Sequence, residues 1–210
     1  MEVLVPFSTD RPKSRLAGVL ESDERAAFAR RMLEDVVRAV RTAGGDPHLL
    51  ATDDVEPPAE IPVTVDTRPL TEAVNAALDR HDPTETGPVG IVMADLALAT
   101  PDALRRLFAS DADVAIAPGR GGGTNALVVR HPAFRVDYHG ASYLDHRRIA
   151  GEADASVAVV DSHRLATDID EPADLAELLI HGDGGATAWL RDTGVVLDDA
   201  NGRVGVTREE

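Results

Sequence analysis

Short apolar runs alternate with longer segments of helical periodicity along most of the chain. Apolar runs of four to eight residues are typical of buried strands. They predict strands over Glu2–Phe7, His48–Ala51, Pro62–Val65, Val89–Met93, Val114–Ala117, Ala126–Val129 and Ser156–Val160. Helical spacing predicts helices from Ser22 to Gly44, over Leu70–Leu78, from Thr100 to Phe108, over Ser142–Ala150 and Glu171–Ile180, and from Thr187 into a tail that ends in a possible strand.

Several predicted helix ends carry residues that favour capping. Ser22 precedes two acidic residues and is expected to be the N-cap of the first long helix, which Gly44 then ends. Thr100 supplies a hydroxyl for capping, and Pro101 suits the first helical position because its missing N–H would be unpaired there anyway.

The alternation of strands and helices predicts an α/β fold with a mostly parallel sheet flanked by helices. No repeat or linker divides the chain, and the proline-containing stretch Asp82–Pro88 is expected to be a loop, so we expect one domain over residues 1–210. Ligands in open α/β sheets bind beyond the carboxyl ends of the strands. The residues that follow the predicted strands are therefore the candidates for a site.

The composition restricts the possible partners. The formal charge of −16 argues against a nucleic-acid surface, which needs excess positive charge. Aspartate is more frequent than glutamate, and Lys13 is the only lysine beside twenty arginines, a balance that suggests adaptation to high salt. No cysteine is present, no apolar run approaches the roughly 20 residues of a membrane span, and no leader pattern precedes the first strand. We expect a cytoplasmic protein.

Three aspartates are candidates for a metal site. Asp95 ends an apolar strand, where a charge is unfavourable unless it is paired or binds a metal. Asp168 and Asp170 are two residues apart, which places both carboxylates on one face of an extended segment. Such oxygen ligands suit Mg²⁺. The simpler alternatives are that Asp95 caps or turns the next loop and that Asp170 is the N-cap of the following helix.

The glycine-rich stretch Arg120–Asn125 follows another strand. Successive glycines allow backbone N–H groups to surround a phosphate, and Arg120 adds a fork of donors that suits one. Thr124 and Asn125 add a hydroxyl and an amide. The alternative is a hairpin turn between two strands that has no ligand.

The loop after the first strand carries Arg11, Lys13 and Arg15. In so acidic a chain, three neighbouring cations favour a bound anion over a merely basic surface loop. A compact ammonium differs from a flat guanidinium where one phosphate must be contacted in a tight loop. We therefore interpret Lys13 as a contact to a nucleotide phosphate, with Arg15 beside it and Arg11 peripheral.

These stretches resemble the 2-phospho-L-lactate guanylyltransferase family of coenzyme F420 biosynthesis. The matching motifs, in order, are Pro6-Phe7, Lys13-Ser14-Arg15-Leu16, Arg31–Val36, Ala94-Asp95-Leu96, Arg120–Leu127, Gly140 with Ser142 and His146, and Asp168–Leu175. They extend over nearly the whole chain. The resemblance implies a nucleotide-diphospho-sugar-transferase-like (Rossmann-like) fold, a homodimer, and the reaction of GTP with 2-phospholactate to give lactyl-2-diphospho-5′-guanosine and pyrophosphate. It also makes handover of the product to a downstream deazaflavin transferase plausible.

The family's functional residues can be carried over to the matching positions. The resemblance implies that Asp95, Asp168 and Asp170 hold Mg²⁺ and that Lys13, Arg15 and Asp95, together with Pro6, meet the nucleotide, the first three of them as catalytic residues. Thr124, Gly140 and Ser142 would line the acceptor site with Arg120 and Asn125. In some relatives the glycine stands three residues before the serine, and that position is His139 in this chain. The assignment of Gly140 is therefore less secure than that of Ser142. His146 could touch the acceptor or could simply pack within its helix.

Other functions remain open from the sequence. The acceptor could be phosphoenolpyruvate or 3-phosphoglycerate, which differ from phospholactate only around the phosphate-bearing carbon. An enzyme that attaches GMP to a molybdopterin or a sugar phosphate is more distant, because such enzymes usually carry a glycine-rich loop directly after the first strand and this chain has no glycine before Gly18. A non-catalytic nucleotide-binding or scaffolding subunit is a further alternative, but a protein that only binds GTP would have little use for all three of Asp95, Asp168 and Asp170.

Overall fold

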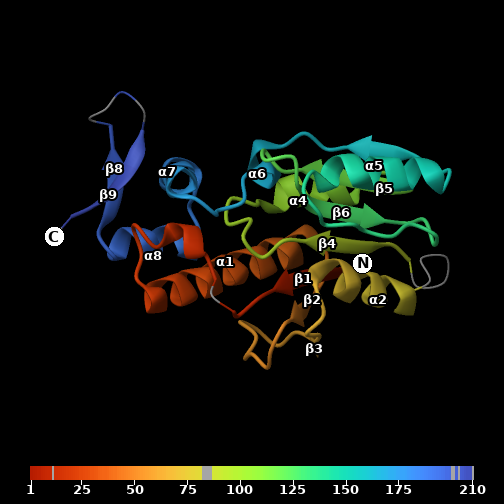
Figure 1. Cartoon of the computed structure of the whole chain (residues 1–210), viewed down its shortest axis with the longest axis horizontal. Helices are drawn as coiled ribbons and strands as arrows, with labels where there is room; N and C mark the ends of the chain where they lie inside the picture. The colour runs from red at the N-terminus through yellow and green to blue at the C-terminus, as the bar shows by residue number, and fades with distance from the viewer. Residues whose placement is uncertain (11, 82–86, 200–201, 203, 210) are drawn as a thin grey trace.

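The computed structural model describes residues 1–10, 12–81, 87–199, 202 and 204–209. Arg11 and residues 82–86 of the expected Asp82–Pro88 loop lie outside this range. Within it, the predicted alternation of strands and helices is confirmed, and the two kinds of element form a sheet with helices on both sides (Figure 1).

Seven strands of the described residues form one mixed, mostly parallel sheet. The order across it is β3-β2-β1-β4-β6-β5-β7. The bounds are β1 Glu2–Phe7, β2 Asp46–Ala51, β3 Val63–Val65, β4 Val89–Val92, β5 Val114–Pro118, β6 Thr124–Val129 and β7 Val157–Val159. Each predicted strand is present, with ends shifted by at most two residues.

The direction of β6 positions the site. β1 pairs in parallel with β2 and β4, and β5 pairs in parallel with β7, whereas β6 runs antiparallel to both β4 and β5. The first residues of β6 therefore lie at the edge where β4 and β5 end. Thr124 and Asn125, which begin β6, reach the loops after the other strands for this reason.

Apolar side chains alternate between the two faces of the sheet, as the period of a strand requires. In β1, Val3 and Val5 are fully buried on one side, and Leu4 is buried on the other. Helices α1, α4, α6, α7 and α8 contribute to the first face, and α2 and α5 cover the second. Their bounds are α1 Ser22–Ala43, α2 Leu70–Arg80, α4 Pro101–Phe108, α5 Ser142–Glu152, α6 His163–Ala166, α7 Pro172–His181 and α8 Gly185–Asp192, with a short 3-10 helix η1 at Ser14–Leu16.

The helix ends confirm some predictions and correct one. Gly44 closes α1 with a left-handed φ of 93°, and the Thr100 hydroxyl accepts the N–H of Ala103 at the start of α4. The N-cap of α1 is Glu21, not Ser22 as predicted from residue preference. The Glu21 N–H donates to the Glu24 carboxylate at 2.9 Å, so a carboxylate three residues on satisfies the helix start and Ser22 enters the first turn.

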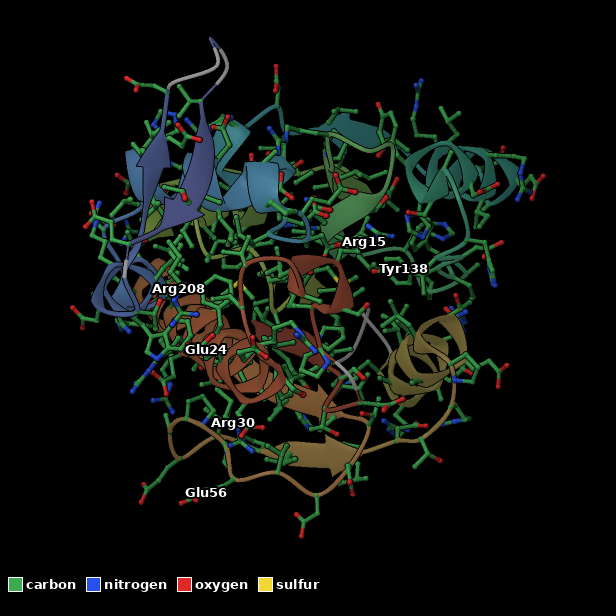
Figure 2. All side chains as sticks on the ribbon, turned by 60° about the vertical axis from the view of Figure 1, so that its left-hand side comes forward. Arg15, Glu24, Arg30, Glu56, Tyr138 and Arg208 are labelled. Atoms are coloured by element: carbon green, nitrogen blue, oxygen red, sulfur yellow. The ribbon has the colours of Figure 1, made fainter. Side chains whose placement is uncertain are left out.

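The C-terminal part packs on α1. The hairpin of β8 (Val195–Asp198) and β9 (Gly205–Arg208) forms a separate two-stranded sheet. Arg208 of β9 pairs with Glu24 at 2.6 Å (both are labelled in Figure 2), and Asp35 of α1 accepts the N–H groups of Gly185 and Ala186 at the start of α8. None of the described helices is both long and apolar enough to cross a bilayer.

Candidate active site

The loops at the carboxyl edge of the sheet enclose a cavity of about 290 Å³. Its lining comes from the end of β1, the loop before η1, helix α1, the end of β4 and the segment before α7. The lining residues include Pro6, Phe7, Lys13, Met32, Asp95 and Asp170. Positions far apart in the sequence therefore meet where the rule for open α/β sheets places a ligand.

Lys13 lies between two carboxylates. Its Nζ donates to Asp95 Oδ2 at 2.8 Å and to Asp170 Oδ1 at 2.6 Å. Burial alone would lower the pKa of this ammonium, but Asp95 and Asp170 together raise it. The backbone of Lys13 is left-handed, with φ 55°, a conformation that residues other than glycine adopt rarely. The loop thus holds the lysine in an unusual conformation that directs its charge at both acids.

Lys13 contacts only one of the two carboxylate oxygens of Asp95. Its Oδ1 is buried and has no hydrogen-bond partner among the described residues. Burial raises the pKa of its carboxyl group, Lys13 lowers it, and the nearby Asp170 and Asp168 raise it further. The carboxylates of Asp95 and Asp170 both contact the single ammonium of Lys13, so acids outnumber cations in this part of the site.

The two aspartates two residues apart are held by different partners. Asn125 Nδ2 donates to Asp168 Oδ1 at 3.1 Å and to the Leu165 carbonyl at 3.0 Å. The intervening Ile169 N–H donates to the Asp95 carbonyl at 3.2 Å, which joins this segment to the end of β4. Contacts with the start of β6 and with the end of β4 therefore position the segment that carries Asp168 and Asp170.

Asp170 does not cap α7, so the simpler interpretation of that residue is wrong. The N-cap is Glu171, and Asp174 accepts the N–H groups of both Asp170 and Glu171 at 3.1 and 2.8 Å. Because Asp174 satisfies the helix start, the Asp170 carboxylate is free to turn toward Lys13. The role left to Asp170 is at the site.

The donor set fits Mg²⁺. Asp95, Asp168 and Asp170 offer only oxygen ligands, which is the preference of that ion, and the unpartnered Oδ1 of Asp95 is a buried acceptor of the kind a cation satisfies. The excess of acids over cations at the site also favours a bound cation. The resemblance implies these three residues, but in the structure their ligand atoms do not all lie within 4.8 Å of one another, and the Lys13 ammonium lies between Asp95 and Asp170.

The glycine-rich connection joins β5 to β6 as a hairpin, the geometry of the simpler interpretation. Gly119 N–H donates to the Gly123 carbonyl, and Gly122 has a φ of 86° that favours glycine. Arg120 pairs with Asp174 at 2.5 Å, and its N–H donates to the Ala166 carbonyl. Arg120 thus contacts both ends of the segment that carries Asp168 and Asp170, and its side chain is 45% exposed.

Thr124, Ser142 and His146 are buried at the start of β6 and in α5. His146 Nε2 accepts the Asp137 N–H at 2.9 Å, so its Nδ1 carries the proton and donates to Thr124 Oγ1, also at 2.9 Å. Burial lowers the pKa of His146 to about 4, although Asp137 and Asp145 oppose the shift. A neutral His146 that donates to Thr124 leaves the Thr124 hydroxyl proton available to another acceptor.

Gly140 and His139 precede this helix. Gly140 has a φ of 49° in the left-handed region, and the exposed His139 pairs with Asp137. The pKa of His139 is raised, because Asp137 hydrogen-bonds to its ring and carries a negative charge beside it. The pairing directs the His139 ring to Asp137. Gly140 supplies the left-handed backbone turn before α5, a conformation that favours glycine.

Arg15 and Pro6 lie at the mouth of the site. Arg15, labelled in Figure 2, is 68% exposed and approaches Asp170 at 3.9 Å and Glu171 at 3.8 Å. Pro6 lines the first cavity and also a second, more apolar one of about 340 Å³, whose other lining residues include Leu50, Thr52, Asp66, Arg68 and Leu70. The two cavities share Pro6, Phe7, Ser8 and Met93, so they adjoin.

Two residues of this region were not singled out from the sequence. Asp174 entered only as part of the Asp168–Leu175 motif, because the Glu171–Asp174 capping box departs from the usual Ser/Thr followed three positions later by Glu/Gln. Asp66 follows a short strand, and the Arg68 side chain, which hydrogen-bonds to it, lowers the pKa of its carboxyl group. Its position after β3 was the available signal.

The chain is similar to known proteins over nearly its whole length. The family model described as "Guanylyl transferase CofC like" matches residues 1–208. A protein of Halorubrum lacusprofundi named 2-phospho-L-lactate guanylyltransferase is 67% identical over 219 residues and is matched over 100% of both chains. One of the same name from Haloferax volcanii is 60% identical, over 100% of this chain and 99% of its own.

Solved structures support the fold. A crystal structure from Desulfovibrio desulfuricans, described as a nucleotide-diphospho-sugar transferase, superimposes with a TM-score of 0.74. It covers 91% of this chain and 94% of its own, at 18% sequence identity. At that identity the match establishes the fold, and it confirms the expected nucleotide-diphospho-sugar-transferase-like architecture.

Proposed function

The chain belongs to the CofC-like guanylyl transferase family, and we propose that it transfers GMP from GTP to (2S)-2-phospholactate. The products would be lactyl-2-diphospho-5′-guanosine, an intermediate in coenzyme F420 biosynthesis, and pyrophosphate. The observation that carries this proposal is the meeting of Lys13 with Asp95 and Asp170 beside a cavity at the carboxyl edge of the sheet. The identity of the acceptor rests on the names of the close relatives.

The two adjoining cavities suit the two ends of a nucleotide. The first would hold the triphosphate, with Lys13 in its lining and Arg15 near Asp170 as phosphate contacts and with bound Mg²⁺ offsetting the charge of its acids. The second is mainly apolar and holds the Asp66 carboxylate. Guanine presents an amino-group donor that a carboxylate can accept, so the base would occupy this second cavity and Pro6 would pack between base and phosphates.

Asp95, Asp168 and Asp170 would hold Mg²⁺. When bound, that ion supplies positive charge that screens the approaching phosphates and stabilises the departing pyrophosphate. Asn125 keeps Asp168 in place, and Asp174 leaves Asp170 free to face the site. Lys13 would exchange its contact with these acids for a contact with nucleotide phosphate oxygen.

The acceptor would lie near Thr124 and Ser142. The Thr124 hydroxyl, which His146 supports from behind, can donate to a phosphate or carboxylate oxygen. Arg120 stands four residues before Thr124 in the sequence and pairs with Asp174. It would therefore position the segment beside the acceptor. Gly140 would contribute backbone at the start of the same helix.

The reaction needs no protein base. A phosphate oxygen of the acceptor attacks the α-phosphorus of GTP, and the bond from that phosphorus to the oxygen bridging the β-phosphorus breaks, so that pyrophosphate leaves with the electron pair. The second ionisation of a phosphate monoester has a pKa of about 6, so the nucleophile is already ionised near neutral pH. The protein's task is positioning and charge neutralisation.

Pyrophosphate release tests the proposal. The protein is mixed with GTP and Mg²⁺ in high salt, and each of 2-phospholactate, phosphoenolpyruvate and 3-phosphoglycerate is added in turn. The proposal predicts the highest kcat/KM with 2-phospholactate. A clear preference for another phospho-acid would change the acceptor, and no release with any of them would favour a nucleotide-binding module.

Further properties belong to the same proposal. The family resemblance supports a homodimer, the composition supports a cytoplasmic location, and the reactivity of the activated diester supports handover to a downstream deazaflavin transferase. Close relatives in Halorubrum and Haloferax, together with the charge of −16, support a high-salt working medium.

A further inference from the structure

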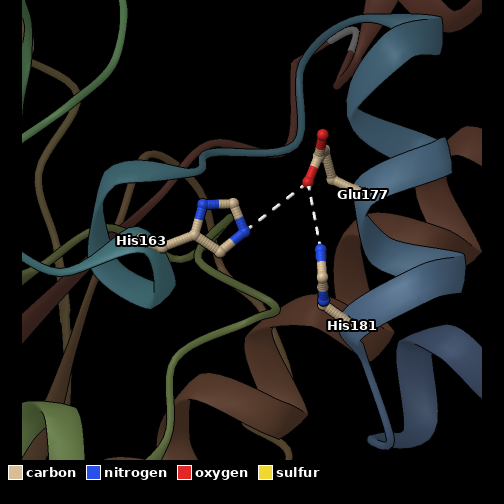
Figure 3. Close-up of side chains that lie close together, drawn as sticks. All are labelled: His163, Glu177 and His181. Carbon is tan, nitrogen blue, oxygen red and sulfur yellow. Dashed lines mark ion pairs between the residues drawn. The ribbon is translucent and has the colours of Figure 1, made fainter. Parts of the chain in front are cut away.

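Two histidines and a glutamate meet on the surface away from the nucleotide cavities. His163 begins α6, and Glu177 and His181 lie one turn apart on α7 (Figure 3). Glu177 Oε2 is 3.5 Å from His163 Nε2 and 3.6 Å from His181 Nε2. Each of the three side chains offers one ligand atom, and all these atoms lie within 4.8 Å of one another.

These separations approach those of a tetrahedral metal centre. Ligands about 2.0–2.1 Å from Zn²⁺ lie roughly 3.4 Å apart along the edges of a tetrahedron. Two of the three edges are already within about 0.2 Å of that value. The third joins the two imidazole nitrogens, whose rings are in edge contact with centroids 5.1 Å apart, and small rotations about the side-chain bonds would close it.

The chemistry of the donors selects a class of metal. Two imidazole nitrogens and one carboxylate oxygen suit Zn²⁺ and neighbouring transition metals, whereas the all-oxygen set of Asp95, Asp168 and Asp170 suits Mg²⁺. The exposed fractions are 48% for His163, 43% for His181 and 31% for Glu177, so water can reach the open fourth position. We propose that His163, Glu177 and His181 form a Zn²⁺-binding site.

The location gives such a site a structural consequence. His163 and His181 lie at the two ends of the segment that carries Asp168 and Asp170. The Arg164 guanidinium already donates to the His181 carbonyl at 2.5 Å, so the two ends are tied by one hydrogen bond. A metal held by both histidines would close the same 19-residue span and restrict the opening of α6 from α7.

A competing explanation is that Glu177 pairs with protonated imidazoles and binds no metal. The two explanations differ in their response to Zn²⁺. Zinc titration by calorimetry, with Mg²⁺ saturating in every cell, measures the site while the carboxylate cluster is occupied. The full chain is used in one high-salt buffer. The variants are His163→Ala and His181→Ala, and the matched control is His139→Ala, an exposed histidine that also pairs with an acid.

The proposal predicts one Zn²⁺ per chain for the wild type and for His139→Ala, with a dissociation constant of about 1 µM or lower. Each of the two site variants should weaken binding at least about tenfold. Zn²⁺ should also raise the melting temperature of the wild type and of His139→Ala, and not that of the site variants. Absence of binding to the wild type, or equal binding in the His163→Ala and His181→Ala variants, would overturn the proposal.

Visible absorption of Co²⁺ gives a second readout that does not depend on stability. A nitrogen and oxygen site of low coordination number should give an intense band in the wild type that both site variants lose. If a variant fails to fold, Glu177→Gln, which keeps the side chain's size, replaces it and should weaken the band. A band of equal intensity in all folded variants would assign the signal to other groups and contradict the site.

Discussion

The ammonium group of Lys13 contacts two acids that the sequence separates by 82 and 157 residues from it. An ammonium is a compact charge with three donors that can point in different directions. A guanidinium is planar and longer, and its donors form a rigid fork. The left-handed backbone of Lys13 fixes the origin of the side chain, so a longer group has little freedom to adjust. This explains a lysine at one position of a chain that otherwise uses arginine.

Replacement of Lys13 tests this explanation. Lys13→Arg keeps the charge, and we expect a fall in kcat of at least about tenfold with a raised KM for GTP, because the guanidinium cannot occupy the space between Asp95 and Asp170. Steady-state kinetics of pyrophosphate release provide the measurement. Arg148→Lys, an exposed change on α5, is the matched control and should have no effect. Unchanged kinetics in Lys13→Arg would show that only a positive charge is needed at position 13.

His146 should make folding sensitive to acid. Its folded pKa of about 4 lies below the ordinary value of 6.5, because the ring is buried. Between these values the unfolded chain binds a proton that the folded chain does not, so the free energy of unfolding falls as the pH falls through this window. We expect a loss of about 2–3 kcal/mol from this group between about pH 7 and pH 4.5.

Urea unfolding at both pH values measures the effect. His146→Gln can hydrogen-bond to Thr124 and to the Asp137 N–H without titrating. Its free energy of unfolding should therefore fall less on acidification than that of the wild type. Equal falls in the two proteins would contradict a buried neutral His146.

At the scale of elements, the turn between β5 and β6 positions Asp168, one of the three proposed Mg²⁺ ligands, through Asn125. A Cβ atom added at Gly119 would lie 2.5 Å from Asn125 Oδ1, closer than van der Waals contact permits. Displacement of Asn125 would release Asp168, to which it donates. Glycine is therefore needed at position 119, because a larger residue would displace Asn125, and the position of Asp168 depends on Asn125.

Gly119→Ala should therefore lower both stability and activity. We expect a loss of about 1–3 kcal/mol in the free energy of unfolding and at least about a tenfold fall in pyrophosphate release. Gly151→Ala, on α5 where an added Cβ meets no atom within 4 Å, should raise stability slightly, because alanine favours a helix. Wild-type behaviour of Gly119→Ala would show that Asn125 can move without harm to the site.

The elements were largely predictable from the sequence, because apolar periodicity reports directly on which face of a strand or helix is buried. The corrections came where local preference was overridden. Ser22 is a good N-cap by preference, yet the Glu21–Glu24 hydrogen bond moves the helix start. The reversed direction of β6 was left open between a phosphate-binding loop and a hairpin turn, since periodicity carries no information on whether neighbouring strands are parallel or antiparallel.

The site was predictable in its residue types and less so in its contacts. The sequence indicated Asp95, Asp168, Asp170 and Lys13, because a charge at the end of an apolar strand is unfavourable unless it is paired or binds a ligand. It could not show that Asn125 holds Asp168, or that Asp174 releases Asp170 from a capping role. These contacts join distant segments, and only the packing of the sheet determines them.

At the scale of the whole molecule, the formal charge of −16 creates repulsion that dissolved salt can screen. We expect the free energy of unfolding to rise when KCl increases from about 0.1 M to about 2 M. Urea unfolding curves at several KCl concentrations give the measurement. Full stability in the absence of added salt would contradict the adaptation to high salt that the composition suggests.

The central claim is that Asp95, Asp168 and Asp170 form one Mg²⁺-dependent centre for GMP transfer, and Asp168→Asn tests it most directly. The asparagine keeps the size of the side chain and its carbonyl oxygen can still accept the Asn125 hydrogen bond, so the fold should survive. The decisive measurement is the initial rate of pyrophosphate release from GTP and 2-phospholactate with saturating Mg²⁺. We predict a rate at least about 10³-fold below that of the wild type; a folded Asp168→Asn protein with the wild-type rate would contradict the account.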